Sequence, residues 1–180
     1  MTKPEPAAPT DALGHAWSEP VRDIPERGLE RDREATIEEK ARLAAALDLV
    51  SIDTLRVRYR IRPSAGGRYL LRGRLEATIG QTCVVSLATL TNTIAQDLDV
   101  SFWPAADITP PSEGAVDLED ESEPEPIEDG LLPIGRIVFE TFAAAIDPFP
   151  RAPDAKLDWK TPEDGAAAPS PFAALARLKK

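Results

Sequence analysis

The sequence predicts an α+β fold: an antiparallel β-meander, as a sheet or a partly open barrel of about four to six strands, covered by two or three helices. Two observations carry this prediction. Residues 54–103 alternate between apolar and polar side chains over several stretches, which is the period of a strand with one buried face. Residues 36–47 and 133–146 instead repeat apolar side chains at helical spacing. Polar termini and an acidic loop complete the predicted organisation.

Length and composition favour a single domain over residues 15–160. The chain has 180 residues, of which 42% are hydrophobic, enough for one core. Residues 1–14 are polar and proline-rich and are predicted to form a disordered arm. Residues 161–180 are predicted to be a linker followed by a short helix that begins near Ser170.

The net charge of −10 is concentrated in one acidic segment. Nine acids and no base lie between residues 113 and 129: Glu113, Asp117, Glu119, Asp120, Glu121, Glu123, Glu125, Glu128 and Asp129. Like charges and prolines oppose compaction, so residues 105–129 are predicted to be a flexible segment within the domain. Its role is either that of a solubilising spacer or that of an active electrostatic element.

The N-terminus and the cysteine content favour a cytoplasmic location. The segment "MTKPEPAAPTDALGHAW" has no apolar core of the kind that a signal peptide needs. No stretch approaches the roughly 18 apolar residues of a membrane helix, so no membrane partner is expected. A single cysteine fits a reducing compartment.

Seven arginines share the even-numbered positions of a predicted hairpin over residues 54–80. They are Arg56, Arg58, Arg60, Arg62, Arg68, Arg72 and Arg74. If the turn at "PSAGG" pairs Arg62 with Arg68, then Arg58 lies opposite Arg72 and Arg56 opposite Arg74. A shift of the strand register by two residues would still keep all seven arginines on one face. Directly opposed like charges are destabilising, so something should offset them. The alternatives are a solvated outer face, a face that binds anions or RNA, and a docking face for a protein.

Cys83 is predicted to be a buried structural residue. In "QTCVVSL" Cys83, Val85 and Leu87 alternate with Thr82, Val84 and Ser86, so the thiol is expected to point toward the apolar side of a strand. Ser86 occupies the position that a C-x-x-C partner would take. Burial should raise the pKa of the thiol and leave it inert.

The two helical segments carry start and stop signals. Thr36 and Glu39 form a capping box, after which Ile37, Ala41, Ala44 and Leu47 make a narrow apolar stripe. The second helix starts at Pro133 and stops before Pro148 and Pro150. Its predicted buried face comprises Ile134, Ile137, Val138, Thr141, Phe142 and Ala145, while Arg136 and Glu140 project outward.

No constellation in the sequence indicates catalysis. His15 is the only histidine, so no Cys–His nucleophile pair and no zinc cluster are expected in the core. Nucleotide-binding glycine motifs are absent from the sequence. We therefore expect a non-enzymatic protein with no catalytic residue, no cofactor, no metal and no small-molecule substrate.

The order of several motifs resembles the YceD-like family, the large ribosomal RNA subunit accumulation proteins, and most of all their alphaproteobacterial branch. The motifs are "WSEPV", "ATIEEKARLAAAL", an R-x-R strand, "GQTCVVSL", "FWP" and "GRIVFETFAAAIDPFPR", followed by "SPFAAL". Many relatives carry C-x-x-C where Cys83 and Ser86 stand, and "DLG" where this chain reads "PIG" at residues 133–135. The resemblance implies a non-enzymatic factor that promotes accumulation or processing of large-subunit ribosomal RNA, with that RNA or a large-subunit precursor as its partner.

Two modes of action are compatible with that role. The protein binds RNA or a pre-ribosomal particle through the arginine-rich hairpin face, or it is an adaptor for a ribosomal or assembly protein with little RNA contact. Phe149 and Arg151 in "DPFPR" are the candidate partner-binding residues of the adaptor, because Phe149 lies rigidly between two prolines. The competing interpretation of this motif is a helix stop in which Phe149 packs into the fold.

Overall fold

The computed structural model describes residues 13, 15–108 and 123–156. Its main sheet has five strands in the order β2-β3-β4-β5-β6. These strands span Leu29–Glu34 (β2), Ser51–Ser64 (β3), Arg68–Thr82 (β4), Thr89–Pro104 (β5) and Glu125–Ile127 (β6). A two-stranded sheet pairs β1 (Glu19–Pro20) with β7 (Leu131–Leu132), and the helices are α1 (Ile37–Ala46) and α2 (Ile134–Ala145).

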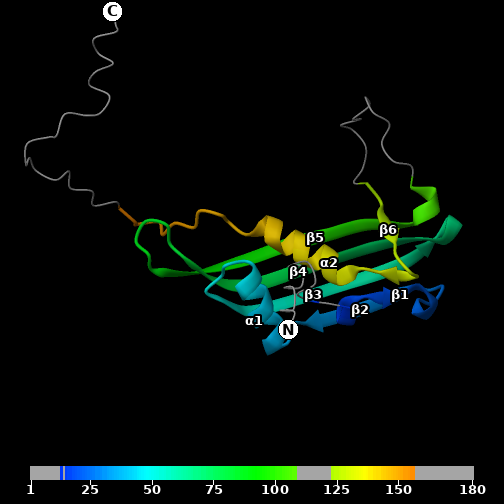
Figure 1. The fold of residues 1–180 in the computed structure, drawn as a ribbon, viewed down its shortest axis with the longest axis horizontal. Helices are drawn as coiled ribbons and strands as arrows, with labels where there is room; N and C mark the ends of the chain where they lie inside the picture. The colour runs from blue at the N-terminus through cyan, green and yellow to red at the C-terminus, as the bar shows by residue number, and fades with distance from the viewer. Residues whose placement is uncertain (1–12, 14, 109–122, 157–180) are drawn as a thin grey trace, which may run out of the picture.

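The predicted α+β fold is confirmed, in the form of an open sheet rather than a barrel. Neighbouring strands of the main sheet are antiparallel except for β5 and β6. The long strands β3, β4 and β5 lie side by side, with the β3–β4 turn at one end of the sheet and the β4–β5 turn at the other (Figure 1). These ends are called here the hairpin end and the loop end.

The core lies on one face of the sheet. The odd-numbered side chains of β3, including Leu55, Val57 and Ile61, are fully buried there. Phe102 from β5 and Phe142 from α2 are also fully buried in the same cluster. Helix α2 runs along β5, and α1 lies against β3 near the loop end (Figure 1). The other face of the sheet carries the even-numbered arginines.

The predicted inward face of α2 is largely correct. Ile134, Ile137, Val138 and Phe142 are buried, and Thr141 and Ala145 are half-buried. Arg136 and Glu140, the two residues predicted to project outward, form an i,i+4 ion pair at 3.5 Å, and Arg136 is half-buried. Arg136 also donates to Glu125 at 2.6 Å, a contact that no local pattern indicated.

The predicted inward stripe of α1 is wrong at its first two positions. The capping box of Thr36 and Glu39 is present, but Ile37 is 78% exposed and Ala41 is exposed as well. Glu39 and Leu43 are the buried residues of the helix. The reason is a tertiary hydrogen bond: the Trp17 indole donates to Glu39 at 2.9 Å, which turns that carboxylate inward and Ile37 outward.

The predicted flexible segment over residues 105–129 is also wrong at its edges. Residues 105–107 form a short 3-10 turn, and Glu125–Ile127 form strand β6, which pairs with Phe102–Pro104. The ion pair of Glu125 with Arg136 holds this strand against α2. The central acids, residues 109–122, lie outside the described residues, as do residues 1–12 and 157–180 with the predicted arm and C-terminal helix.

The described part of the chain contains neither a candidate membrane-spanning helix nor a candidate metal-binding group. Neither of its helices is long and apolar enough to cross a membrane. No group of three or more His, Cys, Asp or Glu side chains in those residues is arranged to hold a metal ion.

Candidate functional site

The seven arginines share one face of the sheet, as predicted. The register of the hairpin differs from the one in which Arg62 pairs with Arg68. Arg58 pairs with Arg74 and Arg60 with Arg72, so the hairpin is shifted by two residues. The shift arises at the turn, where Ala65–Gly67 form a 3-10 turn with Gly66 and Gly67 at positive φ, and Ser64 pairs with Arg68. All seven side chains stay on the outer face because the side-chain period of a strand is two.

Acids from the flanking strands stand beside these arginines in rows across the sheet. The first two rows read Glu30–Arg60–Arg72–Asp99 and Asp32–Arg58–Arg74–Asp97. The third row reads Glu34–Arg56–Glu76–Ala95. Strand β2 is acidic on this face, β3 and β4 are mainly basic, and β5 is acidic again. The outer face therefore carries alternating stripes of charge rather than a continuous basic surface.

Ion pairs connect these stripes. Six of the seven arginines lie within 4 Å of a carboxylate: Arg56–Asp32, Arg58–Glu76 at 2.9 Å, Arg60–Glu30 at 3.2 Å, Arg68–Asp107 at 3.8 Å, Arg72–Asp99 at 3.2 Å and Arg74–Asp97 at 2.7 Å. Exposed pairs contribute only about 0–1 kcal/mol each to stability. Their larger effect is electrostatic, because a phosphate that approached the face would compete with carboxylates already in place.

One row of the sheet near the hairpin end contains no acid. Arg62 pairs across the strands with Leu70, which in turn faces Ser101, so this row has one cation and no acid. Among the described residues Arg62 has no ion-pair partner. A small hollow of about 160 Å³ lies here, lined by Arg60, Arg62, Leu70 and Arg72. The Arg68 guanidinium stacks over Trp103 in the next row, 3.7 Å from the ring centroid.

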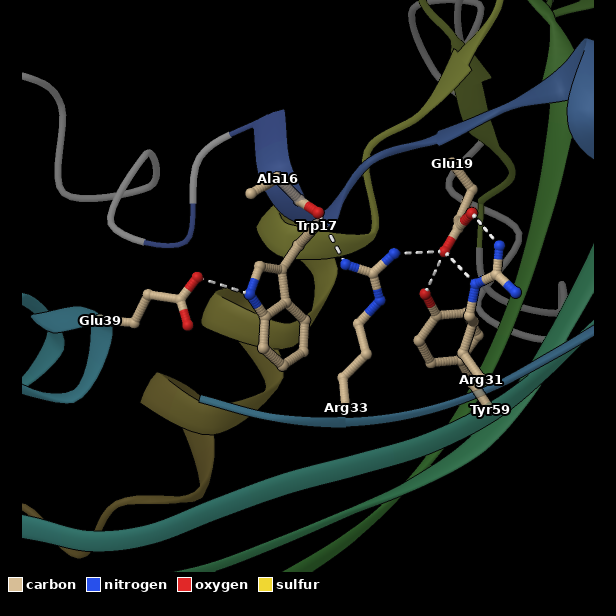
Figure 2. Close-up of polar contacts among 7 residues, drawn as sticks. All are labelled: Ala16, Trp17, Glu19, Arg31, Arg33, Glu39 and Tyr59. Atoms are coloured by element: carbon tan, nitrogen blue, oxygen red, sulfur yellow. Dashed lines mark hydrogen bonds and ion pairs between the residues drawn. The ribbon is translucent and has the colours of Figure 1, made fainter. Parts of the chain in front are cut away.

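A second polar cluster lies on the inner side of the sheet, around the buried carboxylate of Glu19 (Figure 2). Glu19 is only 3% exposed and accepts hydrogen bonds from Tyr59 at 2.7 Å, from Arg33 at 2.6 Å and from Arg31 at 3.1 Å. Arg33 also donates to the carbonyl of Ala16 at 2.6 Å. The cluster ties the segment before β1 to strands β2 and β3.

Electrostatics within this cluster favour the ionised carboxylate. Burial alone would raise the pKa of Glu19, but hydrogen bonds from Tyr59 and the two arginines outweigh it, so the pKa lies below its usual value. Burial and the neighbouring carboxylate raise the pKa of Tyr59, which keeps the phenol protonated as a donor. The hydrogen-bond donors to Glu19 are all side chains of the fold itself, and the carboxylate is buried. The cluster therefore stabilises the fold and is not an open binding site.

Cys83 lies in a turn rather than on a strand, because β4 ends at Thr82. The residue is fully buried, as predicted. Its pKa, however, is lowered to about 6, by a side-chain hydrogen bond with Ser86 and then by the backbone N–H groups of Ser86 and Ala152. These two N–H groups each lie 3.4 Å from the sulfur. The expectation of a raised pKa is wrong because the buried sulfur accepts hydrogen bonds, which favour the thiolate.

The segment after α2 is pinned to the loop end through this turn. Val84 donates its backbone N–H to the Pro150 carbonyl at 2.9 Å, and the Gln81 side chain donates to the Asp147 carbonyl at 2.9 Å. Gln81 is itself buried and held by Asn92 at 2.8 Å. These bonds lie on both sides of Phe149, so the backbone that presents its ring is fixed.

Phe149 is nevertheless 74% exposed. The interpretation in which its ring packs into the fold is therefore wrong, and Pro150 is the residue that is buried there. Three more large apolar side chains are at least half exposed in the turns at this end: Val50 at 54%, Val84 at 51% and Leu87 at 76%. Arg151 is exposed too, and it donates to the Ala155 carbonyl at 3.0 Å.

A groove of about 470 Å³ runs between these turns. It is lined by Leu47, Asp48, Leu49, Val50, Gln81, Thr82, Val84, Ile146, Asp147, Pro148 and Pro150. Two of these residues are acids, Asp48 and Asp147, and none is a base. We call this groove, together with the exposed side chains of Val50, Val84, Leu87 and Phe149, the apolar end.

Comparisons of the chain with protein-family models, with curated proteins and with solved structures gave no match. The resemblance to the YceD-like family therefore stays a prediction that rests on the motifs quoted above.

The structure brings the two groups of predicted site residues to different places. The arginines lie on the outer sheet face among acids, and Phe149 and Arg151 lie at the loop end. Sequence reasoning missed strand β2 and the Glu19 cluster. No local pattern marked the cluster, because Glu19 meets Tyr59, Arg31 and Arg33 only when β2 lies beside β3.

Proposed function

We propose that this protein is a non-enzymatic factor that promotes the accumulation or processing of large-subunit ribosomal RNA, and that it acts as an adaptor for a ribosomal or assembly protein. The biological role comes from the motif resemblance. The mode of action comes from one observation: Phe149 is 74% exposed on a backbone that is pinned on both sides.

An exposed aromatic side chain on a fixed backbone is well suited to anchor a partner. Large aromatic residues dominate the binding energy of many protein interfaces. When such a residue is already held in place, binding loses less conformational freedom. Val84, which is half exposed, is hydrogen-bonded to Pro150 and so lies next to the segment that carries Phe149, and Leu87 is exposed in the same turn as Val84. A group of exposed apolar residues marks an interaction surface more than an isolated one does.

Direct RNA binding through the arginine face is the second candidate. The alternating charge stripes weaken this mode, because most arginines already have a carboxylate beside them. The hairpin end favours it locally, since Arg60, Arg62 and Arg72 surround a hollow that no acid lines. RNA contact would then be confined to a few phosphates at that end.

The adaptor mode is tested by exchanging Phe149 for serine in growing cells. Chemical cross-linking and affinity capture of the tagged protein should recover large-subunit precursors with the wild type, and at least about tenfold less with Phe149→Ser, as expected for loss of a hot-spot residue. Ile37→Ser is the matched control, because Ile37 is equally exposed but lies on α1, outside the turns of the apolar end. Equal capture by both variants would contradict the adaptor mode.

A salt titration separates the two modes. Phosphate contacts release counterions, so the logarithm of an RNA affinity falls steeply with the logarithm of the salt concentration. The adaptor mode predicts weak RNA binding whose slope is unchanged when Arg60, Arg62 and Arg72 are replaced by serine. If the triple variant flattens the slope by roughly one unit per lost contact, the hairpin end binds RNA directly.

A further inference from the structure

The apolar end holds most of the exposed large hydrophobic side chains among the described residues. Of the five large hydrophobic side chains that stand out as exposed, four lie in the turns at this end, and only Ile37 lies elsewhere. The groove between them has two carboxylates, Asp48 and Asp147, and no cation among its lining residues. Its chemistry therefore fits a segment that combines apolar side chains with positive charge.

The last eleven residues of this sequence have that composition. Residues 170–180 read "SPFAALARLKK" and contain three bases and no acid. Phe172, Leu175 and Leu178 recur every third residue, which places them on one face of the helix predicted from the sequence. No other stretch beyond the described residues combines apolar spacing with net positive charge, since residues 1–12, 109–122 and 157–169 each contain more acids than bases.

The described part of the chain also ends only a few residues after the groove. Asp147, Pro148 and Pro150 line the groove, with Phe149 exposed between the two prolines, and the described residues continue only to Lys156. Thirteen residues, 157–169, then separate Lys156 from the basic segment. A connection of this length spans roughly 20 Å on average. That distance allows a return to the groove without strain.

We propose that residues 170–180 bind the groove of the apolar end in the same chain and cover it until a partner displaces them. The apolar face of the segment lies against Val84 and Phe149, and its basic residues lie near Asp48 and Asp147. The inference rests on the proposed function in treating the apolar end as the docking surface. It adds that the isolated protein occupies this surface itself.

Intramolecular binding requires only a weak intrinsic affinity. A short tether keeps the segment at an effective concentration near the millimolar range. If the free peptide bound with a Kd of about 100 µM, roughly nine-tenths of the grooves would be covered in cis, and an added peptide or partner would bind about tenfold more weakly. Two tail substitutions should relieve that competition.

The experiment measures fluorescence anisotropy of a labelled synthetic peptide, SPFAALARLKK, with full-length protein. The peptide should bind the tail variant Phe172→Ser/Leu175→Ser about tenfold more tightly than the wild type, whose groove is already covered. Adding Phe149→Ser to the tail variant should remove most of this binding. Adding Ile37→Ser should leave it unchanged, because Ile37 lies on α1 and not in the turns of the apolar end.

The charge contribution has its own matched variant. Asp48→Asn/Asp147→Asn removes both carboxylates, while the amide oxygen introduced in place of the Asp147 carboxylate can still accept the Phe149 N–H, which Asp147 accepts at 2.9 Å. Asparagine also suits the positive φ of 53° at Asp48. In the tail-variant background this exchange should weaken peptide binding about threefold to tenfold and reduce its salt dependence.

Three outcomes would overturn the inference: no measurable peptide binding, equal affinity for wild type and tail variant, or binding that is indifferent to Phe149→Ser. These results are distinct from failure of the proposed function. If the tail fails to bind but Phe149→Ser still loses the cellular partner, only the inference falls. If the tail binds and Phe149→Ser keeps the partner, the adaptor mode falls while self-coverage of the groove stands.

Discussion

Replacement of Glu19 by glutamine should destabilise the fold strongly, although the side chain keeps its shape. Glu19 is 3% exposed and its carboxylate faces two guanidinium groups, at 2.6 Å from Arg33 and 3.1 Å from Arg31. Removing one partner of a buried ion pair typically costs 3–5 kcal/mol, because the other charge is left uncompensated. Arg31 and Arg33 are 39% and 25% exposed, so water relieves part of that cost. We therefore expect a loss of about 2–3 kcal/mol in the free energy of unfolding.

The same substitution should alter the pH dependence of stability. The pKa of Glu19 is lower in the folded state than its usual value of 4.5, so its stabilising contribution is fully present above about pH 4.5. The contribution is lost as the pH falls through the lowered folded-state pKa, because the unfolded chain binds the proton more tightly. The wild type should therefore lose more stability in acid than Glu19→Gln does.

Urea denaturation followed by tryptophan fluorescence between pH 3 and pH 7 measures both effects. Glu30→Gln is the matched control, because Glu30 also pairs with an arginine, Arg60 at 3.2 Å, but is 71% exposed. This control should cost less than about 1 kcal/mol. The reasoning would be refuted if Glu19→Gln and Glu30→Gln had the same small effect, or if Glu19→Gln left the acid branch of the stability profile unchanged.

Three further substitutions test the core, the thiol and the sheet. Phe142→Ala removes a fully buried ring and should cost roughly 3–5 kcal/mol, whereas an unchanged melting temperature would mean that α2 does not pack through this face. Cys83→Ala should cost about 1 kcal/mol and leave capture of large-subunit precursors intact, and a thiol reagent should label the native protein slowly because the sulfur is buried; fast labelling would contradict that burial. Gly73→Ala should destabilise by more than about 2 kcal/mol, because a Cβ there would lie 2.5 Å from the Arg58 carbonyl and 2.7 Å from the Tyr59 Cβ; a stability equal to the wild type would show that the strands can separate to admit it.

Strand β2 shows where prediction from the sequence stopped. Its residues, "LERDRE", contain one apolar side chain, so no alternation marks them as a strand. They form an edge strand because their backbone groups hydrogen-bond to β3. Arg31 and Arg33 also donate to the buried carboxylate of Glu19, which lies 12 and 14 residues earlier in the chain. An edge strand of this kind is defined by its partners and not by its own pattern.

Phe149 shows the same limit at the candidate site. The prolines on either side of it correctly indicated a rigid segment after the helix. Whether the ring pointed inward or outward was open, because both arrangements satisfy the local sequence. The bonds from Val84 and Gln81 decide the matter by placing Pro150 in the buried position and leaving Phe149 outside.

By itself the sequence determined the α+β class, the approximate positions of the long strands and α2, and the common face of the seven arginines. These are consequences of local periodicity, since a period of two or 3.6 is written into neighbouring residues. Only the tertiary structure decided what stands beside those arginines. Asp32 and Asp97 reach the row of Arg58 and Arg74 from strands far apart in the chain, through registers that the turns and the core impose. A local pattern assigns a side chain to a face, but its neighbours on that face depend on how distant strands pair.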